Sequence, residues 1–240
     1  MTAKEAQKLL GIRDDQVLLL KAALYPPDEA IGYWQQWKKH WNLLPNSLLG
    51  GAGDRASFAQ IDTESQRILP LVFRNLEHTQ DPLLPALKET YRVTWMRNQR
   101  LLQKAQAVVK ALNDANIPNM LLKGIPMSLH YYKDMGVRPM GDVDILVPYE
   151  YLDQVVEILK TLGNIPNPIE YKYRHLLHAM HCFDEGGIDV DLHWFVHYLQ
   201  MNKKTEDEYW KHRIPFSLTD TIETSILAPH HQVFHNIIHG

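Results

Sequence analysis

The sequence has little cysteine and no long apolar run, and each absence narrows the class of protein. Cys182 is the only cysteine among 240 residues, which excludes a disulfide within the chain and fits a reducing compartment. No apolar stretch approaches the roughly 20 residues that a membrane-spanning helix needs. The first residues are polar and lack the apolar region of a signal peptide. We therefore expect a cytoplasmic protein that does not bind a membrane.

Neither sign of charge is in large excess. The sequence has 25 Lys and Arg residues against 28 Asp and Glu residues, a net charge of -3. This balance does not indicate an extended nucleic-acid-binding surface, although it is compatible with a local basic patch. The hydrophobic fraction of 45% and the charged fraction of 22% are ordinary for a globular protein. Composition alone therefore predicts only a globular protein of one large or two modest domains.

The usual zinc motifs are also missing, although the sequence has 13 histidines. His175, His178 and His181 are spaced by three, and the four histidines within 230–239 include pairs spaced by four. A zinc site needs three or four converging nitrogen or sulfur ligands, and no C-x-x-C or H-E-x-x-H motif accompanies these residues. We interpret these histidines as structural, and Cys182 as a packing residue.

The pattern of apolar residues changes along the chain. Helical periodicity dominates first, then short strand-like segments alternate with helices, and then helices resume. The last predicted helix stops at the end of the sequence, as expected for a truncated chain or a short natural end. The predicted parts are a helical N-terminal region at 1–115, an α/β core at 116–200 and a C-terminal helical segment at 201–240. We predict an α+β fold in which a helical region precedes a small mixed sheet flanked by helices.

Two acids stand in a segment with the pattern of a buried strand, GDVDILV at 141–147. Side chains two residues apart share one face of a strand, so Asp142 and Asp144 should project together. Two neighbouring carboxylates repel each other unless a cation lies between them. Oxygen ligands suit Mg²⁺ or Mn²⁺. The pattern predicts a divalent-metal site, and we expect Asn at either position to relieve the repulsion.

A third acid comes from the segment IDVDLHW at 188–194, which follows a predicted Gly-Gly hairpin turn. Alternation places Asp189, Asp191 and His193 on one face of this strand. Either aspartate can complete a carboxylate site with the acids of the neighbouring strand. His193 shares the acidic face, where it can orient Asp191, contact a substrate or serve only the structure.

A glycine turn precedes both acidic strands. Gly124 follows an expected strand at 118–122, and a helix follows the turn. Glycine lets backbone N–H groups approach an anion, and the helix N-terminus adds its dipole. Lys123 and Arg138 supply positive charge nearby. A cation site beside an anion-binding turn is typical of enzymes that transfer a phosphoryl group from a nucleotide.

The ordered set of motifs over 121–194 resembles the DNA polymerase β-like nucleotidyltransferase superfamily. More closely, it is similar to a poorly characterised bacterial group with the pattern LKG…RPMGDxDxLV…[DE]LHW, and the likeness includes LPLVFRNL at 69–76. The resemblance implies that two metal ions bind to the strand acids and that the glycine turn contacts the triphosphate. The implied metal ligands and catalytic residues are Asp142, Asp144 and Asp191, and the implied nucleotide-binding residues are Lys123, Gly124, Arg138 and Gly141.

The implied activity is metal-dependent transfer of a nucleoside monophosphate from an NTP to an acceptor. The acceptor stays open among a small molecule, a tRNA end and a protein side chain. One departure from the superfamily favours an alternative, because Ile125 follows Gly124 where a serine or glycine is usual. The alternatives are a catalytically inactive nucleotide-binding or regulatory module and a component of a toxin–antitoxin pair. The Asp-Leu-His-Trp context favours Asp191 over Asp189 as the third ligand.

Overall fold

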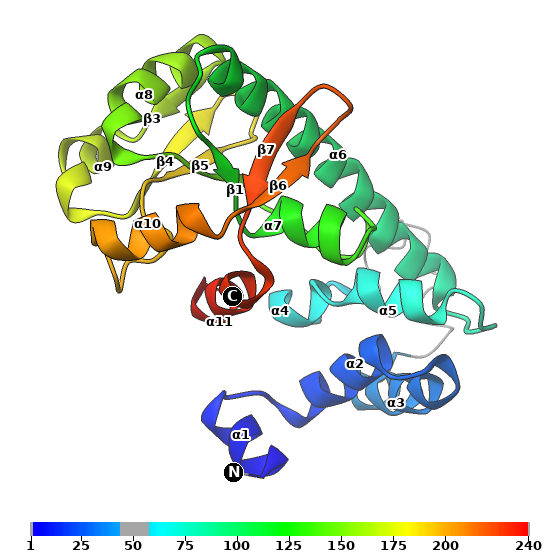
Figure 1. Ribbon diagram of the computed structural model, residues 1–240. Helices are drawn as coiled ribbons and strands as arrows, with labels where there is room; N and C mark the ends of the chain where they lie inside the picture. Colours follow the sequence, from blue (N-terminus) through cyan, green and yellow to red (C-terminus); the bar gives the residue numbers. More distant parts are fainter. Residues whose placement is uncertain (1, 44–57, 240) are drawn as a thin grey trace. The chain divides into compact units, whose positions relative to one another are not determined.

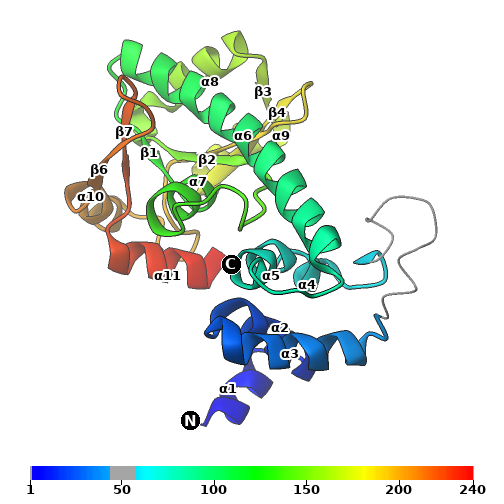
Figure 2. The ribbon, with the colours of Figure 1, turned by 90° about the vertical axis from the view of Figure 1, so that its right-hand side faces the viewer.

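The structure is a computed structural model that describes residues 2–43 and 58–239, and these residues fall into two compact units. The N-terminal unit combines the chain up to Arg97 with the loop Asp134–Pro139. The C-terminal unit holds Asn98–Lys133 and the chain from Met140 onward. The long helix α6 is continuous through the boundary at residue 97 (Figure 1, Figure 2). Within the part of the chain that the structure describes, no helix is long and apolar enough to cross a membrane.

The N-terminal unit is helical, as the periodicity predicts. Its helices are α1 (Ala3–Leu9), α2 (Asp14–Leu24), α3 (Pro27–His40), α4 (Thr63–Gln66), α5 (Leu69–Leu76) and the first part of α6 (Leu84–Asp114). Trp34 and Trp37 are fully buried and stacked, with ring centroids 5.1 Å apart. They anchor an apolar core to which α2, α3 and α5 contribute.

The loop Asp134–Pro139 is fastened within the N-terminal unit. The Asp134 carboxylate accepts hydrogen bonds of 2.8 Å from the Tyr91 hydroxyl and from the Gly136 N–H group. A Cβ atom at position 136 would lie only 2.2 Å from the Tyr91 ring, so only glycine fits there. The glycine of this loop is therefore explained by packing against Tyr91.

The C-terminal unit is built on a mixed sheet. Its strands are β1 (Met120–Leu121), β2 (Val143–Leu146), β3 (Asn164–Pro166), β4 (Ala179–Asp184), β5 (Val190–His193), β6 (Ile214–Ser217) and β7 (Glu223–Ile226). Its other elements are the end of α6, α7 (Gly124–Pro126), the π-helical turn η3 (Met127–Tyr131), the 3₁₀ turns η4 (Tyr149–Tyr151) and η5 (Arg174–Leu176), α8 (Leu152–Thr161), α9 (Pro168–Lys172), α10 (Lys203–Lys211) and α11 (Pro229–His239).

The described strands form one seven-stranded sheet in the order β3-β4-β5-β2-β1-β7-β6 (Figure 1). Pairs β5–β2 and β1–β7 are parallel, and the other neighbouring pairs are antiparallel. Strands β2 and β5 lie in the middle, and all of their residues are buried. Their apolar residues alternate with Asp144, Asp191 and His193, so one face of these strands is polar although it is buried. The predicted α+β fold, with strands near the three expected positions, is confirmed.

The segment 201–240 differs from the helical segment that the sequence predicts. Helices α10 and α11 are present, but strands β6 and β7 lie between them as an antiparallel hairpin. Pro215 within β6 argues against a central strand, but β6 is an edge strand, where a missing N–H group is tolerated. Pro166 marks the opposite edge strand, β3, in the same way. These strands are short, which is why periodicity alone did not reveal them.

Candidate active site

The acidic centre is built by the parallel pairing of β2 and β5. Asp144 lies directly opposite Asp191 in this register, so the two side chains project from the same face of the sheet. Asp144 is 4% exposed and Asp191 is 8% exposed. Val143 and Val190 point to the other face and are fully buried. The alternation of apolar and acidic residues thus places two carboxylates side by side within the core.

His193 and Lys123 bring positive charge to these carboxylates. The His193 Nε2 atom lies 3.2 Å from an oxygen of Asp144 and 3.0 Å from an oxygen of Asp191. The Lys123 ammonium group forms an ion pair with Asp144 and lies 3.6 Å from Asp191. Each of the two cationic groups therefore lies close to both acids. The acidic face predicted for His193 is present, and the histidine bridges the acids.

The electrostatics of this cluster follow from burial and from the close charges. Burial alone disfavours a charged His193, but the carboxylates of Asp191 and Asp144 outweigh it and raise its pKa to about 9. Burial likewise works against charge on Asp191, yet His193 and Lys123 hold its pKa below the ordinary value. Burial alone would lower the pKa of Lys123, but the charge and the hydrogen bond of Asp144 outweigh this effect and raise it. These three groups are therefore ionised at neutral pH.

Asp142 stands apart from this compensated set. It lies just before β2, is half-buried and has its pKa raised by burial and by repulsion from Asp144 and Asp191. Among the described residues, the ligand atoms of Asp144, Asp191 and His193 all lie within 4.8 Å of one another, and Asp142 is not in this group. Asp142 is close enough to the other two acids for their charges to repel its own, so its anion is disfavoured.

Asp189 has a different task from Asp191. Its carboxylate accepts a hydrogen bond of 3.1 Å from the Asp184 N–H group, across the β4–β5 turn. Its backbone carbonyl accepts from the Val143 N–H group at 3.0 Å. Asp189 thus fixes the hairpin, whereas Asp191 lies opposite Asp144. The geometry favours Asp191 as the third acid.

The turn after β1 is centred one residue earlier than the sequence indicates. Lys123 has φ 49° and ψ -106°, a left-handed γ-turn-like conformation that is strained for a residue with a side chain. Gly124 is buried and is the first residue of α7. The strained turn directs the Lys123 side chain to Asp144, and such strain is typical of functional sites.

The remaining predicted nucleotide-binding residues lie in different places. Gly141 is exposed, directly before the acidic strand, and a Cβ atom there would contact nothing within 4 Å. Arg138 belongs to the loop Asp134–Pro139 of the N-terminal unit, whereas Lys123 and Gly124 belong to the C-terminal unit. Packing within the C-terminal unit therefore gives no reason for a glycine at position 141.

The acidic centre suits a hard divalent cation. The Oδ1 atom of Asp191 is buried and has no hydrogen-bond partner within the part of the chain that the structure describes, although buried carboxylate oxygens usually have one. Asp144 and Asp191 supply further oxygens close by, which are the ligands that Mg²⁺ and Mn²⁺ prefer. His193 adds a nitrogen to the group. The residues present therefore fit a divalent metal.

A comparison with protein families finds a match over most of the chain. A family model described as an uncharacterised nucleotidyltransferase matches residues 62–240. The chain belongs to this family. Membership supports general nucleotidyltransferase activity and implies an NTP substrate. A search among curated proteins gives no match. The resemblance expected from the sequence is therefore confirmed, and the matched region contains the whole acidic centre.

Proposed function

We propose that the protein transfers a nucleoside monophosphate from an NTP to an acceptor hydroxyl or similar nucleophile, with Mg²⁺ or Mn²⁺ as cofactor. The observation that carries this proposal is the in-register pair Asp144 and Asp191, buried together with an unpartnered carboxylate oxygen. Asp142, Asp144 and Asp191 are the proposed metal ligands. When bound, the divalent cations neutralise charge that develops on the transferring phosphoryl group.

Lys123 and His193 have the proposed role of counter-ions that hold the acids together before metal binds. Both contact Asp144 and Asp191. With a divalent cation at the acids, Lys123 would no longer be needed as their counter-ion, and its ammonium group would be free to meet the triphosphate. The backbone N–H groups after Lys123, with Gly124, complete this anion-binding turn. Gly141 leaves open space beside the acids for the nucleotide.

One of these acids is the proposed acceptor of the nucleophile's proton. Without metal, burial and the neighbouring acids raise the pKa of Asp142, and a bound cation would offset that repulsion. Asp191, whose pKa is lowered by His193 and Lys123, is the weaker base of the two in that state.

One observation favours a second candidate, a nucleotide-binding module without catalysis. Ile125 is 2% exposed and lies in the first turn after Lys123, at a position where the superfamily usually has serine or glycine. A buried isoleucine offers no hydroxyl to the triphosphate. Binding without transfer would leave the acids as a metal and nucleotide site with a regulatory use.

The test is transfer of label from NTPs that carry ³²P at the α-phosphate. Each NTP is incubated with the protein, Mg²⁺ and cell extract, and the label is followed into RNA, protein and small-molecule fractions. We expect label transfer with release of pyrophosphate, and loss of transfer in Asp144→Asn. Asp189→Asn is the matched control, because Asn keeps the oxygen that accepts from Asp184. A shift in melting temperature with NTP and Mg²⁺, but no label transfer in any fraction, would favour the binding module.

A further inference from the structure

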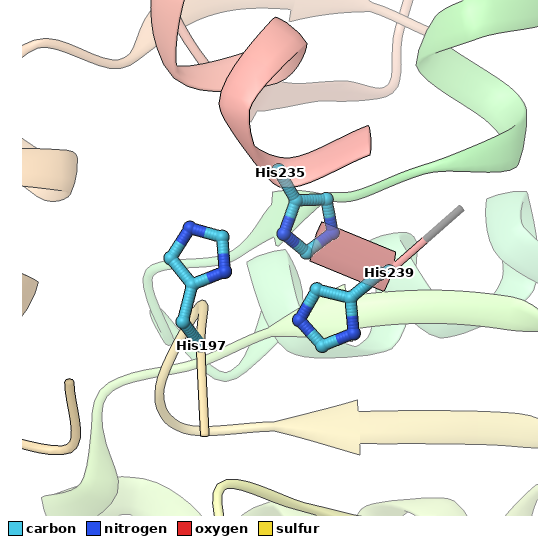
Figure 3. A group of neighbouring side chains, drawn as sticks. All are labelled: His197, His235 and His239. Atoms are coloured by element: carbon cyan, nitrogen blue, oxygen red, sulfur yellow. The ribbon is translucent and has the colours of Figure 1, made fainter. Parts of the chain in front are cut away.

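A second group of buried side chains lies in the C-terminal unit and is made of histidines. His197 follows β5, and His235 and His239 lie one turn apart on α11. The three imidazole rings face a common space (Figure 3). The ring centroids are 5.2 Å apart for His197 and His235, 5.5 Å for His197 and His239, and 4.6 Å for His235 and His239. Their spacing by four on α11 is the pattern visible in the sequence, but the third member comes from 38 residues earlier.

The hydrogen-bonding capacity of these rings is largely unused. His197 is 1% exposed and His235 is 0% exposed, and among the described residues neither ring nitrogen of either histidine has a hydrogen-bond partner. Buried polar atoms in proteins are nearly always paired. His239 is half-buried, and its Nε2 atom lies 3.2 Å from the Val196 carbonyl oxygen. A neutral imidazole carries one lone pair and one N–H group, so each of these two buried rings has a lone pair available to a ligand that accepts it.

The chemistry of the group matches a transition-metal ion. One nitrogen from each of the three histidines lies within 4.8 Å of the others, a spacing that one ion can meet with small side-chain adjustments. Imidazole suits Zn²⁺ and similar ions, whereas Mg²⁺ prefers oxygen. Burial lowers the pKa of His197 to about 4 and that of His235 to about 2. Both rings are therefore neutral at pH 7, the form that binds metal.

We propose that His197, His235 and His239 bind a divalent transition metal of the zinc class, at a site separate from the acidic centre. Three histidines leave a fourth position for water or another ligand, as in sites that are not purely structural. The ion would fasten α11 to the segment after β5. His178 lies between the two centres, with ring centroids 5.6 Å from His193 and 5.7 Å from His239. The site is thus close to the proposed active site but differs from it in ligand type.

The test measures metal binding on protein without an affinity tag, stripped of metal with a chelator. Zinc binding is measured by calorimetry, and Co²⁺ is added to a second sample to record visible absorption bands of a nitrogen-rich site. We expect one tight Zn²⁺ equivalent and a zinc-dependent rise in melting temperature. His239→Gln and His197→Gln should weaken zinc binding by more than about 100-fold, because a ligand is lost rather than only its support.

Two control variants separate this site from other histidines and from the acidic centre. His230 is exposed on the same helix, so His230→Gln should bind zinc as the wild type does. Asp144→Asn removes an acid of the proposed active site and should also keep the Co²⁺ bands. Circular dichroism establishes that each variant is folded. The proposal is wrong if folded wild-type protein binds no zinc tightly, if both His→Gln variants keep full affinity, or if only Asp144→Asn loses it.

Discussion

The acidic centre and the histidine group are two buried polar clusters in one unit, and they are accommodated in opposite ways. Asp144 and Asp191 are charged and are compensated by Lys123 and His193 through short contacts. In the histidine group, burial keeps His197 and His235 neutral, and their rings have no hydrogen-bond partner among residues 2–43 and 58–239. The first cluster therefore holds its acids together through its own cations, whereas the second stays uncharged.

The two clusters therefore differ in which existing contacts a bound metal would replace. A cation that enters the acidic centre has to displace internal positive charge, so part of its binding energy replaces contacts that already exist. A metal at the histidine group would meet lone pairs that have no partner, so nothing has to be displaced except at His239, which contacts the Val196 carbonyl. Removing Lys123 should thus lower the free energy of unfolding more than a substitution in the histidine group does.

The largest expected effect is that of Lys123→Met on the metal-free protein. The ammonium group is mostly buried against Asp144, and removing one partner of a buried ion pair typically costs about 3–5 kcal/mol of folding free energy. Chemical denaturation in chelator measures the loss. Mg²⁺ should recover more stability in this variant than in the wild type, because the uncompensated acids then bind the ion more strongly.

Lys133→Met is the control for that substitution. Lys133 is exposed in the same unit, so its loss should change the free energy of unfolding by less than about 0.5 kcal/mol. Equal stability of the two variants in chelator would mean that Lys123 does not compensate the acids.

The next largest effect is an opposite pH dependence of the two clusters. The raised pKa of His193, about 9 against 6.5 unfolded, gives stability that is complete below pH 6.5 and is lost as pH rises through about 9. The lowered pKa values of His197 and His235 give stability that is present above pH 6.5 and is lost as pH falls below it. The His193 contribution amounts to roughly 3 kcal/mol.

Unfolding in chelator between pH 5 and pH 9.5 measures both limbs of this profile. His193→Gln should flatten the alkaline limb and leave the acidic one. His235→Leu should make the acidic limb shallower but not abolish it, because Leu has no proton to gain and His197 still titrates. If one substitution flattened both limbs, the two clusters would have to be treated as one coupled system.

How much of this could be predicted from the sequence depends on how local the signal is. The alternation around Asp144 and Asp191 is a property of single strands, so the acidic face of each strand could be predicted. The parallel register that sets Asp144 opposite Asp191 depends on pairing between distant segments. The strained turn at Lys123 also escaped prediction, because the adjacent Gly124 is the more usual residue for such a backbone.

The histidine group shows the limit more clearly. Spacing by four placed His235 and His239 on one helix face, but a zinc motif was absent and the histidines were interpreted as structural. His197 lies in a loop that carries no periodic signal, and tertiary packing alone brings it to α11. Strands β6 and β7, which precede α11, were missed for the same reason, since their apolar runs are short.

The third effect concerns nucleotide binding rather than folding. Arg138 can hold two phosphate oxygens at once and keeps its charge at any relevant pH. We predict that Arg138→Ala weakens binding of a non-hydrolysable NTP with Mg²⁺ by about 1.5–3 kcal/mol, the size of a charged hydrogen bond. Calorimetric titration measures it. Unchanged affinity in folded protein would leave Lys123 as the cation that meets the triphosphate.

The smallest effect is a gain in stability, expected for Asp142→Asn in the metal-free protein. Burial and the charges of Asp144 and Asp191 raise the pKa of Asp142, so its anion is destabilised at pH 7. Asn removes that charge and should stabilise the protein by about 0.5–2 kcal/mol.

Asp144→Asn should instead destabilise the protein, because Asp144 pairs with Lys123 and His193. For Asp144, this prediction differs from the expectation from sequence that Asn at either position relieves repulsion. Both variants should lose label transfer, so denaturation in chelator distinguishes acids that the assay treats alike. A loss of stability in both would show that Asp142 is as well compensated as Asp144.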